Sequence, residues 1–382
     1  MEPGEYLEKR REQGLLRTLQ PAESSRNGRI TIAGNEYADL SSNDYLGMAG
    51  HPAIISAARE AMEKYGTSSS ASRLLSRDRR IHHELEELTA SFKGKESALL
   101  FNSGYQANTG VIGALYGRGD AVFADRLNHA SLVDGAVLSG AKVFRFRHND
   151  PGHLGSLLEA SRKKFSRALV VTESVFSMDG DRAPLGALAD LAERHGCQLM
   201  VDEAHATGVF GERGSGAVES EGLTGRVDII MGTYGKALGG FGAYVAASSE
   251  ITGTLVNACR SFIYTTALPP SVAAGNIAAI RLVEADPGRG ARLLGSAARL
   301  RVKLEAAGLA VRGASQIVPV ILGAVDRTAR AALRLREAGF WVLPIRPPTV
   351  PEGESRLRLS LTAGLGDSIL DSLAREAINA CN

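Results

Sequence analysis

Short apolar runs alternate with amphipathic stretches through most of the chain. Runs of four or five mostly apolar residues are typical of buried strands, and apolar residues that recur every three or four positions are typical of helices. Strands are expected near 97–101, 121–124, 142–146, 168–172, 198–201, 227–231 and 242–246, and helices near 53–65, 80–92, 104–116, 130–139, 153–164 and 184–195. This alternation predicts an α/β fold with a mostly parallel seven-stranded sheet flanked by helices.

The two ends of the chain follow other patterns. Residues 5–19 predict an amphipathic helix, and Gly34-Asn35 between two short alternating runs predicts a hairpin. After residue 270 a long helical region is interrupted at 286–288. Strands are then expected near 317–322, 340–343 and 356–361, with helices near 326–338 and 366–380. We therefore expect an N-terminal helix and hairpin segment over 1–45, a large domain over 46–272 and a smaller α+β C-terminal domain over 273–382.

Composition and charge are those of an ordinary globular protein. The 382 residues carry 44 basic and 42 acidic side chains, so the net charge of +2 gives no reason to expect nucleic acid as a partner. Three distant cysteines in no metal-ligand spacing argue against a disulfide framework and against a bound metal. With no signal-peptide pattern and no long apolar window, we expect a cytoplasmic protein that does not interact with membranes.

A lysine in a glycine-rich turn indicates the chemistry. Lys236 lies within residues 233–240, just after a predicted strand, and Asp202 directly follows the strand predicted at 198–201. A lysine amine can form a Schiff base with an aldehyde cofactor, and an aspartate can keep a pyridine nitrogen protonated. Taken alone, a lysine in such a turn is usually an ordinary surface residue, and the aspartate could equally cap the next element.

Further polar motifs also follow predicted strands. Ser103-Gly104-Tyr105 opens a helix whose backbone N–H groups suit a phosphate, although Ser103 could equally be a helix cap. His129 could lie against a flat ring, and Ser177 offers a hydroxyl donor. Because parallel strands end at one edge of a sheet, these motifs should converge there. A lysine, a carboxylate, a phosphate site and an imidazole together fit pyridoxal 5'-phosphate (PLP).

From about residue 5 to its end the chain resembles the α-oxoamine synthase family of fold-type I PLP enzymes. The motifs that carry the resemblance are residues 41–47, 102–105, 128–131, 173–180, 202–205, 232–236, 264–270 and 356–358. The family condenses an amino acid with an acyl thioester and releases carbon dioxide. The proline-rich segment 346–351 favours the branch that joins L-alanine to a pimeloyl thioester, carried by coenzyme A or a carrier protein, in biotin biosynthesis.

The resemblance implies a role for each matching residue on the cofactor side. Lys236 would hold PLP and move the α-proton of the substrate, Asp202 would pair with the pyridine nitrogen, and His129 would stack on the ring. His205 and Ser177 would contact the ring hydroxyl. The phosphate would be bound by Ser103, Gly104, Tyr105 and Thr233 and, from the neighbouring subunit of a homodimer, by Thr265 and Thr266.

On the substrate side the resemblance implies a second set of contacts. Asn43 and Arg358 would hold the carboxylate of the amino acid, with His129 also facing the substrate, and Arg17 and Thr349 would contact the acyl chain. Residues 66–76 depart from the family pattern, because serines and alanine stand where relatives usually have several glycines. Since this loop lies near the amino-acid side chain in relatives, the preference for alanine stays open.

Three alternatives remain at this stage. The first is another α-oxoamine synthase that uses glycine with acetyl- or succinyl-CoA, or serine with a long acyl chain. The second is a non-catalytic binding or regulatory protein with the same fold, although such proteins usually append a DNA-binding domain or lose the lysine. The third is plain transamination. Another synthase would release thiol with a different pair of substrates, a non-catalytic protein would release none, and transamination would form a keto acid.

Overall fold

The computed structural model describes residues 2–381 and divides into two compact units. The large unit comprises Met48–Ser177 and Arg182–Ala291, and the small unit comprises the residues before Met48, Met178–Asp181 and the residues from Arg292 onward. The predicted division after residue 272 falls inside helix α11 (Pro270–Ala285). This helix packs against α2 (Pro52–Tyr65) and α3 (Arg80–Lys93), which places it in the large unit.

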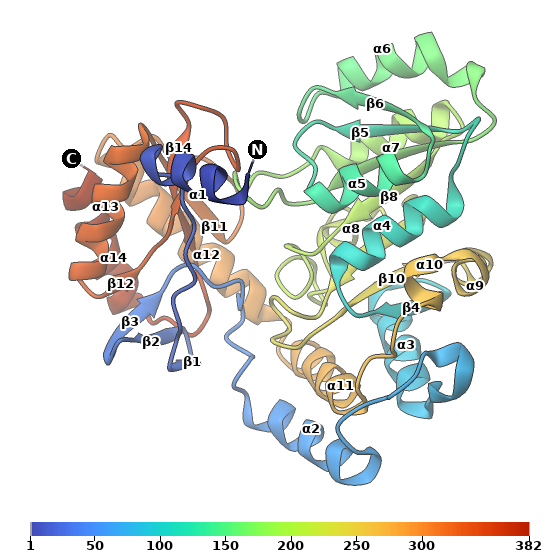
Figure 1. Ribbon diagram of the computed structural model, residues 1–382, viewed down its shortest axis with the longest axis horizontal. Helices are drawn as coiled ribbons and strands as arrows, with labels where there is room; N and C mark the ends of the chain where they lie inside the picture. Colours follow the sequence, from blue (N-terminus) through green and yellow to red (C-terminus); the bar gives the residue numbers. More distant parts are fainter. Residues whose placement is uncertain (1, 382) are drawn as a thin grey trace. The chain divides into compact units, whose positions relative to one another are not determined.

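The large unit is built on the predicted seven-stranded sheet (Figure 1). The strand order is β4-β10-β9-β8-β7-β5-β6, and only β10 runs antiparallel to its neighbours. The strands are β4 (Ser97–Phe101), β5 (Ala121–Asp125), β6 (Lys142–Phe146), β7 (Ala168–Glu173), β8 (Gln198–Asp202), β9 (Ile229–Thr233) and β10 (Ala243–Ala247). β9 begins two residues later than predicted, because the Asp228 carboxylate accepts a hydrogen bond from Leu199 N before the strand starts.

Alternate residues of these strands form the core on one face of the sheet. Pairs such as Leu99 and Phe101 of β4 or Leu169 and Val171 of β7 are at most 3% exposed and belong to one apolar cluster. The cluster includes side chains of α4 (Gly104–Leu115), α5 (Ala130–Leu138) and α9 (Ser249–Ala258). Burying each large aliphatic side chain contributes about 1.5–3 kcal/mol, so this face fixes the sheet firmly beneath the helices.

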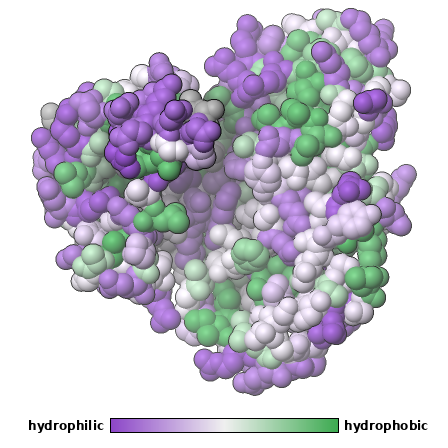
Figure 2. All heavy atoms as spheres, in the orientation of Figure 1, coloured by the Kyte–Doolittle hydropathy of each residue, from purple (hydrophilic) through white to green (hydrophobic). Residues whose placement is uncertain are grey.

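The remaining helices of the large unit complete the α/β pattern. They are α6 (Pro151–Ser161), α7 (Leu185–Arg194), α8 (Ala217–Ser220) and α10 (Arg260–Ile263), with a π-helical turn at Arg73–Arg77 and a 3-10 turn at Arg162–Lys164. The helices α8, α9 and α10 and the π-helical turn were not predicted. On the face seen in Figure 2, hydrophilic side chains prevail and hydrophobic ones gather in smaller patches.

The small unit combines the N-terminal hairpin with the C-terminal elements. Its strands are β1 (Ser24–Arg26), β2 (Arg29–Ile32), β3 (Asn35–Asp39), β11 (Ile317–Gly323), β12 (Phe340–Trp341), β13 (Pro344–Ile345) and β14 (Ser355–Ser360). Its helices are α1 (Pro3–Glu12), α12 (Gly288–Ala306, which begins in the large unit), α13 (Val325–Glu337) and α14 (Asp367–Cys381). The predicted hairpin is present as β2–β3, and β12 adds to β3 in parallel.

The predicted N-terminal helix over 5–19 is wrong in its second half. Helix α1 ends at Glu12, and Gly14 adopts a φ of 65°, the left-handed conformation that commonly terminates helices. The proline-rich segment 346–353 is a loop between β13 and β14, as its three prolines predict. Within residues 2–381, no helix has both the length and the apolar character that crossing a membrane requires.

Candidate active site

Polar side chains gather at the edge of the sheet where its parallel strands end. Glu173, Asp202 and Thr233 are the last residues of β7, β8 and β9, and Glu173 stands opposite Asp202 in the register of β7 and β8. Parallel strands expose their carboxyl ends at one edge, which is where open α/β sheets bind ligands. The candidate site of the large unit therefore lies where the sequence pattern places it.

Lys236 lies in a tight turn that follows β9. Its Nζ is 2.9 Å from Nε2 of His205, which is itself only 6% exposed. The turn is anchored by Tyr234, a fully buried residue whose hydroxyl is 2.7 Å from Thr89 Oγ1. Gly239 adopts a φ of 62°, and a Cβ there would lie 2.3 Å from Ala49 N, so no other residue fits this position. The lysine is thus held in place by a rigid turn.

The Asp202 carboxylate is buried and held by two donors. Ala204 N donates to Oδ1 at 2.8 Å, and Asn108 Nδ2 donates to Oδ2 at 2.9 Å. Both oxygens therefore accept a hydrogen bond, which fixes the orientation of the group. This geometry places a carboxylate acceptor at the end of β8, which is what a protonated ring nitrogen requires of its partner.

His129 caps helix α5 beside this carboxylate. Its backbone N donates to Glu173 Oε1 at 2.6 Å, which fixes the chain where the loop enters the helix. The residue as a whole is exposed, but desolvation of its imidazole by the surrounding protein lowers its pKa. The charge of Asp202 raises this pKa, and the charge of Lys236 lowers it. A neutral imidazole with an exposed surface is suited to lie against a flat ring.

The start of helix α4 and Thr233 together form a cradle for an anion. Ser103 caps the helix by accepting from Gln106 N at 3.2 Å, so the alternative role as a cap is present. The first backbone N–H groups of a helix have no partner within it, and Gly104 and Tyr105 are the first two residues of α4. Thr233 Oγ1 is buried without a hydrogen-bond partner. An orphaned hydroxyl beside a helix N-terminus fits the phosphate of PLP.

Tyr105 extends this region toward His129. The two rings are arranged edge to face with centroids 6.4 Å apart, and the Tyr105 hydroxyl donates to Asp134. Tyr105 is 47% exposed, so much of its ring is available to a ligand.

Ser177 is half-buried and is the last residue of the segment of the large unit that follows β7.

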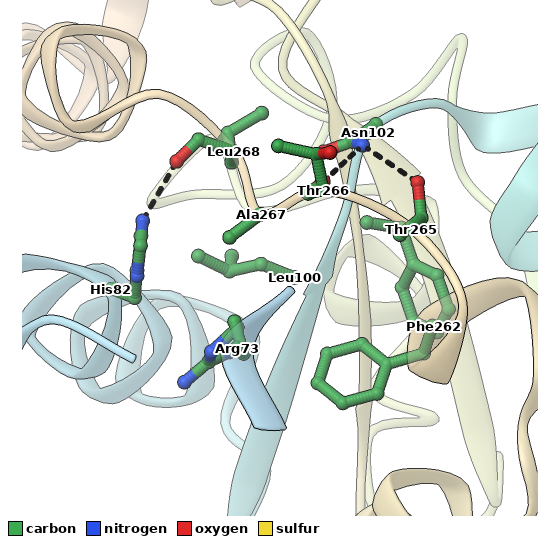
Figure 3. A pocket seen from close by; sticks show the side chains of 10 residues that line it. Arg73, His82, Leu100, Asn102, Phe262, Thr265, Thr266, Ala267 and Leu268 are labelled. Atoms are coloured by element: carbon green, nitrogen blue, oxygen red, sulfur yellow. Dashed lines mark hydrogen bonds between the residues drawn. The ribbon is translucent and has the colours of Figure 1, made fainter. Parts of the chain in front are cut away.

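Thr265 and Thr266 lie on a segment that is fastened at both ends (Figure 3). Asn102 Nδ2 donates to Thr266 O at 2.8 Å and to Thr265 Oγ1 at 3.4 Å. At the other end His82 Nε2 donates to Leu268 O at 2.8 Å. In Figure 3 the side chains of Arg73 and Phe262 line the opposite side of the small pocket beneath this segment. The two threonines are therefore presented on a fixed strap beside the end of β4.

The serine-rich loop is joined to the same strap. The buried Ser69 hydroxyl donates to Leu268 O at 2.8 Å, and Ala267 N donates to Ala71 O at 3.0 Å. Ser70 adopts a φ of 59°, a left-handed conformation that glycine tolerates better than serine. The loop therefore keeps a glycine-like backbone although its sequence lacks the glycines.

Four of the predicted substrate residues lie in the small unit as two pairs, whereas His129 lies in the large unit. Arg358 Nη2 donates to Asn43 Oδ1 at 3.1 Å and to the hydroxyl of buried Tyr45 at 3.3 Å. Arg17 Nη2 donates to Thr349 Oγ1 at 2.9 Å, and both of these residues are exposed. Tyr45 lies in the motif at residues 41–47, but sequence reasoning gave it no role.

Sequence reasoning also missed three residues that hold site residues, or their neighbours, in place. Asn108 donates a hydrogen bond to Asp202, and Glu173 accepts one from the backbone N of His129. Burial and the neighbouring Asp202 charge raise the pKa of Glu173 to about 8. Lys93 forms a buried ion pair with Glu203, the residue after Asp202, at 2.5 Å. An asparagine inside an apolar helix is unusual, so the sequence could have drawn attention to Asn108. Nothing in the sequence pairs Lys93 with a residue 110 positions away.

Comparison with known proteins agrees with this geometry. The family described as "Aminotransferase class I and II" matches residues 35–376. The 8-amino-7-oxononanoate synthases of Geotalea daltonii and Geobacter sulfurreducens are each 51% identical, over 94% and 96% of this chain and 92% and 94% of theirs. The serine palmitoyltransferase of S. paucimobilis, solved with a bound PLP–myriocin aldimine, is 33% identical with a TM-score of 0.93, covering 98% of this chain and 96% of that one. The chain therefore belongs to the class I and II aminotransferase family and, within it, is related to the 8-amino-7-oxononanoate synthases.

Proposed function

We propose that the protein is a PLP-dependent acyltransferase that condenses L-alanine with a pimeloyl thioester. The products are 8-amino-7-oxononanoate, carbon dioxide and the free thiol, and the reaction belongs to biotin biosynthesis. The observation that carries this function is the gathering of Lys236, Asp202 and the cradle of Gly104 and Thr233 at one sheet edge, in a chain about half identical to synthases of that name.

The residues of the large unit suit PLP at each of its polar groups. PLP, when bound, supplies the electron sink that takes up the charge left by the α-proton. Lys236 holds the cofactor covalently and then moves that proton, with its Nζ within reach of His205. The Asp202 carboxylate keeps the ring nitrogen protonated. Thr233 and the start of α4 bind the phosphate, and His205 and Ser177 contact the ring hydroxyl.

The remaining predicted residues complete the proposal on the substrate side. His129 lies against the ring and faces the substrate. Arg358 presents a planar guanidinium, which binds carboxylates in a bidentate manner, and together with Asn43 it holds the carboxylate of the amino acid. Arg17 and Thr349 contact the acyl chain. Thr265 and Thr266, fixed by Asn102, serve the phosphate of a neighbouring subunit in a cytoplasmic homodimer.

The test is a panel of substrates on purified, PLP-loaded protein. Alanine, glycine and serine are each combined with pimeloyl, acetyl, succinyl and palmitoyl thioesters, on coenzyme A and on a carrier protein, while thiol release and product mass are recorded. We expect turnover to be greatest with alanine and a pimeloyl thioester. A clear preference for glycine or serine, or keto-acid formation without thiol release, would refute the proposal. Lys236→Ala should abolish turnover.

A further inference from the structure

A hydrogen-bond network joins His129 to Asp202 through two side chains that the proposed function leaves without a role. Asn108 Nδ2 lies 2.9 Å from Asp202 Oδ2 and 2.9 Å from Ser131 Oγ. Ser131 Oγ lies in turn 2.8 Å from Nδ1 of His129. Asn108 and Ser131 are each 1% exposed, so both links are shielded from bulk solvent.

The packing of two helices places Asn108 beside Ser131. Asn108 belongs to α4 and Ser131 to the first turn of α5. One turn further along α5, a Cβ on Gly135 would lie 2.8 Å from Asn108 O, so only glycine lets the two helices approach this closely. The backbone therefore holds the amide of Asn108 at a fixed distance from the start of α5.

Asp202 at one end of the network and the backbone N–H of Ser131 at the other set the directions of its hydrogen bonds. A carboxylate can only accept, so the amide of Asn108 must turn its NH₂ group toward Asp202. The second hydrogen of that group goes to Ser131 Oγ, which accepts it. The hydroxyl hydrogen of Ser131 is then left for Nδ1 of His129. Ser131 N also donates to Nδ1, at 3.2 Å, so this nitrogen accepts from two donors.

We propose that Asn108 and Ser131 are positioning residues that hold His129 as the neutral imidazole with its proton on Nε2. Through the same bonds Asn108 fixes the orientation of the Asp202 carboxylate. On the proposed function, on which this consequence rests, His129 presents Nε2–H as a hydrogen-bond donor toward cofactor and substrate. Protonating Nδ1 would set its N–H against the backbone N–H of Ser131, which can only donate, and would force the Ser131 hydroxyl to turn from donor to acceptor, so the imidazolium form is disfavoured.

Other charges also act on His129, and the test must leave them unchanged. Asp202 of β8 and Asp134 of α5 raise its pKa, whereas Lys236 and desolvation lower it. Glu173 of β7 accepts from its backbone N. Substitutions of Ser131 and Asn108 alter the network without removing any of these ionisable groups.

The experiment is NMR of the full-length, PLP-free protein with ¹⁵N-labelled histidine. Long-range ¹H–¹⁵N correlations distinguish protonated from unprotonated ring nitrogens, and His129→Gln assigns the signals. We expect Nδ1 of wild-type His129 to be unprotonated at neutral pH. Ser131→Ala should raise the His129 pKa by about half a unit to one unit, the effect of one lost hydrogen bond. Asn108→Ala should shift it in the same direction, because the Ser131 hydroxyl is no longer oriented.

Two variants serve as controls. Ser131→Thr keeps a hydroxyl and should restore the wild-type titration, and Ser139→Ala, at the far end of α5, should leave it unchanged. A proton on Nδ1 in the wild-type protein, or equal titrations for Ser131→Ala and Ser139→Ala, would overturn the inference. These signals need neither PLP nor turnover. Protein that fails to make 8-amino-7-oxononanoate yet shows the expected tautomer would therefore refute the proposed function and support this inference.

Discussion

Gly104 faces Thr233 so closely that a Cβ on Gly104 would lie 2.9 Å from Thr233 Cγ2. This contact brings the N-terminus of α4 against the last residue of β9, whose buried hydroxyl has no hydrogen-bond partner among residues 2–381. A helix N-terminus attracts anions through its free N–H groups and its dipole. The pair therefore forms the anion cradle that we propose for the phosphate of PLP.

Replacing Gly104 with alanine should weaken cofactor binding. The added methyl group must push the Thr233 side chain aside. The charged phosphate then loses one or two of the hydrogen bonds that the protein donates to it. Each such bond contributes about 1.5–3 kcal/mol, so we expect the Kd for PLP to rise by at least tenfold. Titration of the PLP-free protein, followed by absorbance, measures this change.

Gly113→Ala is the matched control on the same helix. A Cβ at Gly113 meets nothing within 4 Å, and alanine favours helices by about 1 kcal/mol over glycine. This variant should bind PLP normally and unfold at a slightly higher temperature. If both alanine variants bound PLP equally well, the assignment of the cradle to phosphate would be wrong.

Thr233→Val should have opposite effects on the empty and the loaded protein. Valine keeps the shape of threonine but removes a buried hydroxyl that lacks a partner, and an unsatisfied buried group costs about 1–3 kcal/mol. The PLP-free variant should therefore unfold at a higher temperature than the wild type. Because the phosphate loses a donor, the stabilisation on adding PLP should shrink. Thermal unfolding with and without PLP checks both effects, and a destabilised PLP-free variant would contradict the argument.

The pH dependence of stability should report on Glu173. Its pKa is raised from 4.5 to about 8 in the folded protein, by burial and by the Asp202 charge. Between these values the unfolded carboxyl is ionised while the folded one keeps its proton, so rising pH favours unfolding. Glu173→Gln keeps an acceptor for His129 N and cannot titrate. Its stability relative to the wild type should rise from pH 5 to pH 8 and then level off, which melting curves of PLP-free protein would show.

Adjacent serines in the loop at 66–76 should respond in opposite directions. Ser70 has a left-handed backbone, so Ser70→Gly should raise the free energy of unfolding by up to about 1 kcal/mol. Ser69 is buried and donates to Leu268 O, so Ser69→Ala should lower it by about 1 kcal/mol. Urea unfolding of the two variants measures both changes. Equal effects would show that the loop conformation differs from the one described.

The sequence predicts the sheet and the site edge because both depend on local patterns. Short apolar runs followed by polar residues locate Asp202 and Thr233 at strand ends, and the parallel fold then brings them together. The end of α1 at Glu12 was missed because a single glycine, Gly14, outweighs the amphipathic pattern that continues beyond it. An asparagine inside an apolar helix marks Asn108 as unusual, but neither its partner Asp202 nor the pairing of Lys93 with Glu203 can be read from the sequence, because these partners lie 94 and 110 positions away.

Lys93→Met should be far more destabilising than the loss of a surface ion pair. Lys93 and Glu203 are each about 1% exposed, and Lys93 also donates to Ser215 O, so methionine would leave a buried carboxylate without its cation. Breaking such a pair costs about 3–5 kcal/mol.

The matched control is Lys303→Met, which removes the exposed pair with Asp371 and should cost less than about 1 kcal/mol. The carbonyl of Glu203 accepts from Ala206 N and Thr207 N in the turn that carries His205, so Lys93→Met should also weaken PLP binding, whereas Lys303→Met should not. Urea unfolding and PLP titration of both variants test this, and equal losses of stability would show that the buried pair adds nothing beyond a surface contact.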